Sequence, residues 1–170
     1  MIVLETERLL LRHFRIDDAE FILELLNEPS FQEHIGDKGV RTVDDAKLYL
    51  QNGPLQSYEA YGYGLNMVEL RSSGEAIGMC GLVKRDGLDD ADIGYAFLEQ
   101  YWSNGYARES AGAILNHARE TLGLERVVAI VTPGNLSSIR LLEKIGLTFE
   151  RMIRLADGDK ELKFFASDAG

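Results

Sequence analysis

The sequence contains few of the residues that build disulfide or metal frameworks. Its 170 residues include one cysteine, three histidines and three prolines. The lone thiol, Cys80, has no intramolecular partner and lies in an apolar run, which favours a buried structural cysteine over an acyl-carrying nucleophile. The histidines are scattered, with no zinc-ligand spacing, so we expect no metal.

Several motifs of common enzyme classes are also missing. There is no Gly-x-Ser-x-Gly elbow and no Gly-x4-Gly-Lys-Ser/Thr loop, which argues against α/β-hydrolase and nucleoside-triphosphatase chemistry. The pair Gly62-Tyr63-Gly64 lacks a third glycine and leads into a predicted strand. It therefore does not form a dinucleotide-binding fingerprint.

Long apolar runs and excess positive charge are absent as well. No stretch approaches the about 20 apolar residues of a membrane-spanning helix, and the N-terminus does not resemble a secretory signal, so we expect a cytoplasmic protein without a membrane partner. Acidic residues number 28 against 18 basic ones, for a formal charge of −10. This charge disfavours nucleic acid as a partner and attracts a basic or amine-bearing substrate.

The length and the 45% hydrophobic content suit one domain over residues 1–170. A strand is expected at 2–14, with Leu9 and Leu11 on one face. A helix capped by Asp17, with Glu20 completing the box, is expected to end before Pro29. Residues 30–41 are expected to form a loop or broken helix. Thr42 is expected to cap a second helix.

The second half of the chain predicts a mixed α/β domain of the α+β type. Strands at 62–70, 75–83 and 91–98 are separated by short turns, which predicts an antiparallel meander. A helical stripe from Ala107 to Leu122 and a β-branched run at 126–131 follow, so a crossover should place two strands in parallel. The remaining expected elements are a helix at 137–145 and strands at 149–155 and 161–166.

The segment 93–107 runs from a strand through a turn of small residues directly into a helix. A helix N-terminus offers unpaired N–H groups and partial positive charge, and Gly105 and Ala107 let a phosphate approach the backbone. The segment therefore predicts either a pyrophosphate site or an ordinary strand-to-helix turn.

Three motifs connect the chain to a known family. Trp102-Ser103-Asn104-Gly105-Tyr106-Ala107 resembles the acetyl-CoA-binding motif of GNAT superfamily N-acetyltransferases, although Trp102 stands where Gln or Arg is usual. Together with Glu109, it looks like the branch that acetylates the N-termini of ribosomal proteins. Residues 135–149 resemble the Asn-x-x-Ser … Glu-Lys-x-Gly-Phe signature, with Leu147 replacing phenylalanine. Residues 4–12 are also similar to that branch, so the resemblance covers nearly the whole chain.

The resemblance implies a GNAT fold, in which a mostly antiparallel sheet with a splayed parallel pair is flanked by helices. It implies acetyl-CoA as co-substrate, with the strand ending at Phe97 and Leu98 splaying after a bulge so that its backbone pairs with the pantetheine arm. It also implies an oxyanion-stabilising N–H near Leu98. The implied cofactor-binding residues are Phe97, Leu98, Trp102, Ser103, Asn104, Gly105, Tyr106, Ala107, Arg108, Asn135 and Ser138.

Three residues are candidates for proton transfer. Ser138 matches the motif serine and can protonate the leaving thiolate, contact the cofactor or cap a helix. Asp92 and Glu69 are candidate bases, and the alternative for Asp92 is a solvated turn within its acidic run. Asn135 fits both a cofactor contact and a helix entry. Tyr95 and Tyr106 can hydrogen-bond substrate or cofactor, or simply pack.

The acceptor is expected to be a primary amine that attacks the thioester directly. Keeping an amine neutral at pH 7 costs about 1 kcal/mol for an α-amine but about 4.6 kcal/mol for a lysine, which favours a peptide N-terminus over a lysine; a small-molecule amine is the other option. Residues 30–59 and the tail hairpin near 157–159 are expected to line the acceptor site. Their acids suit a cationic acceptor or simple solvation: Glu33, Asp37, Asp44 and Glu59. The alternative function is a catalytically silent acyl-CoA-binding sensor or interaction module, and a monomer or homodimer is expected.

Overall fold

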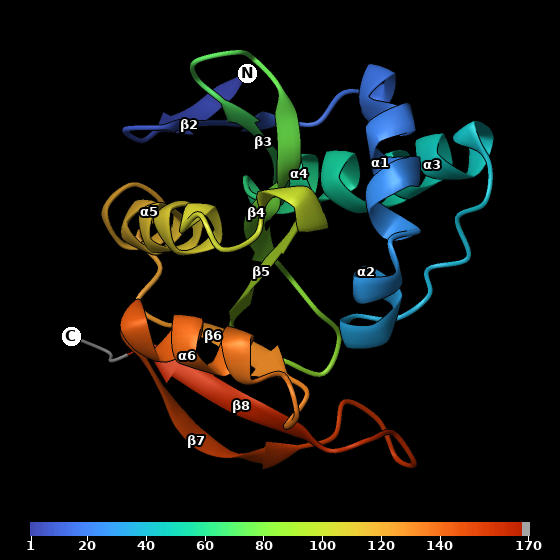
Figure 1. Cartoon of the computed structure of the whole chain (residues 1–170). Coiled ribbons are helices and arrows are strands. Elements are labelled where there is room, and N and C mark those ends of the chain that lie inside the picture. The colour runs from blue at the N-terminus through green and yellow to red at the C-terminus, as the bar shows by residue number, and fades with distance from the viewer. Residues whose placement is uncertain (168–170) are drawn as a thin grey trace.

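The computed structural model describes residues 1–167, which form one twisted sheet with helices on both faces (Figure 1). The strand order is β1-β2-β3-β4-β5-β6-β8-β7. All neighbouring strands are antiparallel except β5 and β6, which are parallel. The strands are β1 (Ile2–Glu5), β2 (Leu9–His13), β3 (Leu65–Leu70), β4 (Ala76–Val83), β5 (Ala91–Phe97), β6 (Val127–Val131), β7 (Leu147–Ile153) and β8 (Leu162–Ser167).

The helices divide between the two faces of the sheet (Figure 1). Their bounds are α1 (Ala19–Leu26), α2 (Pro29–His34), α3 (Val43–Leu50), α4 (Gln56–Tyr61), α5 (Tyr106–Glu120) and α6 (Leu136–Lys144). The apolar stripe of α5, which includes Ala111, Ile114 and Ala118, packs on one face of the sheet, and that of α1, which includes Ile22 and Leu25, packs on the other. Within residues 1–167, no helix is both long and apolar enough to cross a membrane.

The first predicted strand is wrong in one respect, because residues 2–14 form a hairpin of β1 and β2 rather than a single strand. The alternation itself is confirmed, since Leu9 and Leu11 are fully buried. The chain reverses at Thr6 to Arg8, where the Thr6 N–H donates to the Leu9 carbonyl. The local pattern does not distinguish one strand from two because the alternation continues through the turn.

The helix starts agree with prediction only in part. Thr42 caps α3, and its hydroxyl accepts from the Asp45 N–H at 3.0 Å. Asp17 does not cap α1, and Glu20 completes no box. Instead, a 3₁₀ turn at 16–18 precedes α1, and the Asp18 carboxylate accepts from the Arg15 N–H at 2.8 Å. Pro29 lies at the first position of α2, where a missing N–H costs nothing.

The second helical segment extends further than predicted. A π-helical stretch at Gln51–Leu55, which contains buried Pro54, connects α3 to α4. α4 ends at Gly62, whose φ of +79° is left-handed. Tyr58 ties this segment to the sheet, because its hydroxyl accepts from the Phe14 N–H and donates to the Leu65 carbonyl.

The N-terminal turn of α5 is tied to the β1–β2 hairpin through Glu109. This carboxylate accepts from the Thr6 hydroxyl at 2.5 Å, from the Arg8 N–H at 3.1 Å and from the Arg8 Nε at 2.7 Å. Burial disfavours the ionised carboxylate, but these bonds together outweigh burial and lower the pKa of Glu109. The hairpin therefore fixes where α5 begins.

We predict that Glu109→Ala lowers the melting temperature by about 2–8 °C, because partly exposed charged hydrogen bonds are lost. Since the folded pKa of Glu109 lies below its ordinary 4.5, its contribution is full above pH 4.5 and is lost as pH falls through the folded value. The control is Glu120→Ala, an exposed change in the last turn of the same helix. Thermal melts that are the same for both variants at pH 7 would contradict this role.

Candidate functional site

The parallel strands β5 and β6 pair over only a short distance and then separate. Their register contains just Ala91 with Val127 and Asp92 with Val128. Beyond these pairs β5 continues to Phe97 beside β4, while β6 turns toward β8. The expected splay is therefore present in the structure. The expected bulge at the end of β5 is not, because β4 and β5 pair in continuous register and the irregularity lies between Val68 and Glu69 of β3.

The pairing of β5 with β4 determines which of its backbone groups face the gap. The Leu98 N–H donates to the Ile77 carbonyl at 3.0 Å. The Leu98 N–H itself is therefore engaged, and an oxyanion-stabilising N–H near Leu98 stays a prediction. Because bonding alternates along an antiparallel strand, Ala96 and Gly94 also bond to β4, and the backbone groups of Ile93 and Tyr95 point into the gap.

The turn before α5 presents backbone amides at the upper end of this gap. Ser103 and Gly105 both have left-handed φ values, of 66° and 82°. The first hydrogen bond of α5 runs from the Glu109 N–H to the Gly105 carbonyl at 3.0 Å. The backbone N–H groups that precede Glu109 therefore have no partner within the helix. The turn from Trp102 to Gly105 and the side chain of Arg108 are exposed. An anion can therefore reach these amides.

Two long side chains hold this turn in place. The Trp102 indole N–H donates to the Phe97 carbonyl at 2.9 Å, although the ring is 48% exposed. Arg8 donates to the Asn104 carbonyl at 2.9 Å, and its guanidinium lies 4.5 Å from the centre of the Tyr106 ring. Tyr106 is thus a packing partner here. The side chains of Phe97 and Leu98 are buried, so those residues offer only backbone to a ligand.

A cavity of about 790 Å³ passes through the gap from one face of the sheet to the other. On the α5–α6 side it is lined by Tyr95, Ser138 and Leu142. On the α1–α4 side it is lined by the π-helical stretch, by α2 and by the tail hairpin at Leu155 and Leu162. Its size falls within the range of small-molecule sites, about 300–1,000 Å³.

Polar side chains gather where the cavity passes the sheet on the α6 side. The Tyr95 hydroxyl lies 2.6 Å from the Ser138 Oγ, and burial raises the pKa of Tyr95 to about 12. The Ser138 N–H donates to the Asn135 side-chain oxygen at 3.3 Å, which makes Asn135 the cap of α6. Ser138 is therefore not the cap, and its hydroxyl faces Tyr95 and the cavity. The sequence named Tyr95 as a possible partner without predicting this contact.

Asp92 lies at the point where the two strands part, on the α1–α4 side. It is 2% exposed, so the solvated-turn interpretation is wrong. Its Oδ2 accepts from the Arg85 Nε at 2.9 Å, whereas its Oδ1 is buried without a partner among the described residues. Burial raises the pKa of Asp92 to about 6, against the lowering effect of Arg85. A buried carboxylate beside a cavity, with one oxygen left without a hydrogen-bond partner, can accept a proton near neutral pH.

Glu69, the other candidate base, lies outside the lining of this cavity. Its carboxylate bonds the guanidinium of Arg12 at 3.0 Å, and Arg12 also pairs with Asp18 at 2.9 Å. Cys80 is fully buried and burial raises its pKa to about 12, which confirms a structural thiol. Residues 1–167 contain no grouping of three potential His, Cys, Asp or Glu ligands.

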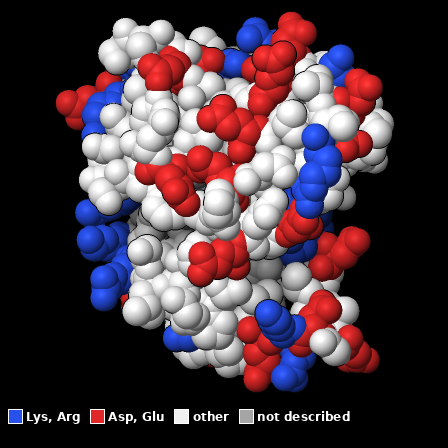
Figure 2. Space-filling model, turned by 45° about the vertical axis from the view of Figure 1, so that its right-hand side comes forward, with Lys and Arg blue, Asp and Glu red and all other residues white. Residues whose placement is uncertain are grey.

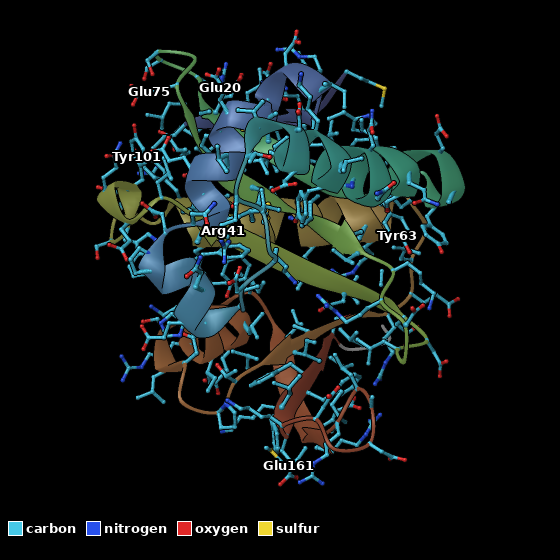
Figure 3. The ribbon with its side chains drawn as sticks, turned by 90° about the vertical axis from the view of Figure 1, so that its right-hand side faces the viewer. Glu20, Arg41, Tyr63, Glu75, Tyr101 and Glu161 are labelled. Carbon is cyan, nitrogen blue, oxygen red and sulfur yellow. The ribbon has the colours of Figure 1, made fainter. Side chains whose placement is uncertain are left out.

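The acids expected around the acceptor do not line the cavity. Asp37 instead pairs with Arg41, which lies in the middle of the α1–α4 face in Figure 3. The charged residues of the lining are Lys38, Lys84, Arg85, Asp86 and Asp92. Sequence reasoning missed these basic residues, because the charge of each segment does not reveal which side chains point inward.

The fold and the site define a mixed α/β domain with a through-going cavity at a splayed parallel pair. Residues 8–148 match the model of the acetyltransferase (GNAT) domain family. An uncharacterized N-acetyltransferase of Bacillus subtilis, YnaD, is 32% identical over 145 residues, which cover 85% of this chain and 82% of that one. An acetyltransferase structure from Agrobacterium tumefaciens superposes with a TM-score of 0.82 at 27% identity, covering 97% and 93% of the two chains.

The protein belongs to the GNAT acetyltransferase family and is an acetyl-CoA-dependent acetyltransferase that acts on an amine. Its sheet has the GNAT arrangement. The fold is also shared with RimL, described as a ribosomal L7/L12 α-N-protein acetyltransferase in complex with coenzyme A. That likeness has a TM-score of 0.85 and covers the whole of both chains at 19% identity.

We predict that a negative charge at position 105 blocks acetyl-CoA binding if the turn before α5 receives the pyrophosphate. Asn and Asp both tolerate a left-handed φ, so Gly105→Asn and Gly105→Asp differ essentially in charge. We expect Gly105→Asp to bind acetyl-CoA at least about tenfold more weakly than Gly105→Asn by calorimetry, while being no less stable than Gly105→Asn, because both strain the backbone alike and acids suit helix N-termini. Equal affinities of the two variants for acetyl-CoA would show that the pyrophosphate does not bind at this turn.

Proposed function

We propose that the protein transfers the acetyl group of acetyl-CoA to a primary α-amine, with the two substrates entering from opposite faces of the sheet. The observation that carries this proposal is the cavity that crosses the sheet between β5 and β6. A cofactor lying along α5 and α6 reaches Ser138 from one side, while an acceptor between α2, α4 and the tail hairpin reaches Asp92 from the other. A silent acyl-CoA sensor needs no second opening.

The residues present suit acetyl-CoA. The exposed turn at 102–108 offers amides to the pyrophosphate, and the backbone of Ile93 and Tyr95 offers an unpaired edge to the amide-rich arm. We assign Asn135 and Ser138 to the end of that arm, because both line the cavity. The bound co-substrate supplies a thioester, which the neutral amine attacks so that an amide forms and the thiol is released.

Within this mechanism, Asp92 is our candidate general base. Its Oδ1 is buried and has no partner among the described residues, so it can take the proton that the amine gives up once the amine or a bridging water molecule reaches it. Ser138, held by the Tyr95 hydroxyl, can donate a proton to the departing sulfur. A thiolate of pKa about 8.5 needs little assistance, so orientation of the thioester is the larger part of the Ser138 role.

An α-amine is the favoured acceptor because it is the easier amine to present in neutral form. We predict that thiol release from acetyl-CoA at pH 7 is faster with unblocked peptide N-termini than with N-terminally blocked lysine peptides. The difference in the cost of deprotonation is about 3.6 kcal/mol. Tight acetyl-CoA binding without turnover on peptide N-termini, lysine peptides, polyamines or aminoglycosides would favour the silent module instead.

The pH profile tests the base. With Asp92 at a pKa of about 6 and an α-amine at about 7.8, log kcat/KM should rise with a slope of about 2 below pH 6 and about 1 between pH 6 and about pH 7.8, and it should level off above that. We predict that Asp92→Asn lowers kcat/KM by about 10²-fold or more and leaves a slope of about 1 at every pH below about 7.8.

The control for this experiment is Asp89→Asn, which changes an exposed acid of the same run. It should keep the wild-type profile. An unchanged slope below pH 6 in Asp92→Asn would show that Asp92 is not the base, even if the rate falls for structural reasons.

A further inference from the structure

The acceptor side of the cavity differs in charge from the rest of the molecule. The chain carries a formal charge of −10, and acidic side chains are spread over the face shown in Figure 2. The cavity lining nevertheless contains more basic than acidic side chains. The field of an acidic protein attracts positive side chains, so this excess does not by itself indicate a ligand, and the partners of each basic side chain decide the question.

Two of the basic side chains already have partners. The Lys84 ammonium donates to the Leu88 carbonyl at 2.5 Å. The Arg85 Nε donates a hydrogen bond to the Asp92 carboxylate. Lys38 is different, because within residues 1–167 it forms neither a hydrogen bond nor an ion pair. The neighbouring residue Asp37 forms its ion pair with Arg41 instead.

Lys38 and Arg85 also influence each other. Lys38 is an exposed residue, yet partial burial of its ammonium and the positive charge of Arg85 lower its pKa. Like charges that share a cavity wall are unfavourable unless an anion lies between them. Two acids share the lining with them, Asp86 and Asp92, and Asp92 is already bonded to Arg85. Glu33 and Glu59 of the surrounding helices do not line the cavity.

The position of the pair fits a ligand that extends from the splay. Arg85 contacts Asp92, which lies at the last paired position of β5, so Lys38 and Arg85 sit on the acceptor side. The same wall carries neutral polar side chains from the π-helical stretch and α4, Asn52 and Gln56. An amine next to Asp92 therefore has a basic region farther along the same cavity.

We propose that the acceptor is an amine that also carries an anionic group, such as a carboxylate, which Lys38 and Arg85 bind while the amine lies at Asp92. This inference rests on the proposed acetyl transfer and names the class of its substrate. The anionic group belongs either to a peptide with an acidic residue next to its N-terminus or to a small amino acid. Both present the same chemistry to the cavity.

The test uses two pairs of acceptors that differ in one anionic group. One pair is the peptide amides Ser-Asp-Ala-Ala and Ser-Asn-Ala-Ala. The other is free serine and serinamide, whose rates are compared at equal concentrations of neutral amine because the free carboxylate raises the amine pKa. We expect kcat/KM to be about tenfold higher for the acidic member of one pair, and the pair that shows this preference identifies the source. Equal use of both members in both pairs would overturn the proposal.

Variants then show which side chain produces the preference for the acidic acceptor. Lys38→Gln should reduce it to near 1 and Lys38→Glu should reverse it, whereas Lys47→Gln, an exposed change on α3 outside the cavity, should leave it unchanged. A preference that persists in Lys38→Gln would also overturn the proposal. If no amine is acetylated, the proposed function fails separately. Calorimetry of the same four compounds with the coenzyme A-loaded protein then decides the inference, since acidic members that bind no more tightly contradict it.

Discussion

The separation of β5 from β6 after their last shared pair is the constraint on which the rest of the site depends. Asp92 and Val128 are the last paired residues of the two strands. The proposed binding site for acetyl-CoA is the gap between β5 and β6 beyond this pair. An unfilled gap in a central sheet leaves backbone groups without partners, which costs free energy in a buried position. We propose that the arm of acetyl-CoA completes this pairing, so the defect in the sheet is a binding surface.

The two faces of the sheet contribute different parts to this arrangement. On one face, Thr6 and Arg8 fix the start of α5 through Glu109, so the exposed amides of its first turn are held beside the gap. On the other, the helices from α1 to α4 cover only part of the sheet. Figure 3 shows this face, with Glu161 of the tail hairpin at the far end from α1. On this face the cavity lies between those helices and the tail hairpin.

From residue 62 onward the order of strands and helices, the meander and the parallel crossover could be predicted, because each depends on local periodicity and short connections. The turn at Gly105 could be predicted from its strand-to-helix context, whereas its role in binding the pyrophosphate stays a prediction. Burial of Asp92 could not be predicted, because an acidic run predicts a surface turn and only the packing of β4 and β6 around the strand encloses the last carboxylate. Contacts such as Thr6 with Glu109 join residues far apart in sequence and leave no local pattern.

The most direct test of this account is a crystal structure with acetyl-CoA bound. We predict that its pantetheine arm lies between β5 and β6 against the backbone of Ile93 and Tyr95, with the pyrophosphate on the amides of the turn before α5. The acetyl group should then lie in the cavity between Ser138 and Asp92. A cofactor bound elsewhere, with β5 and β6 still apart and the cavity empty, would contradict the claim that the two substrates meet through the sheet.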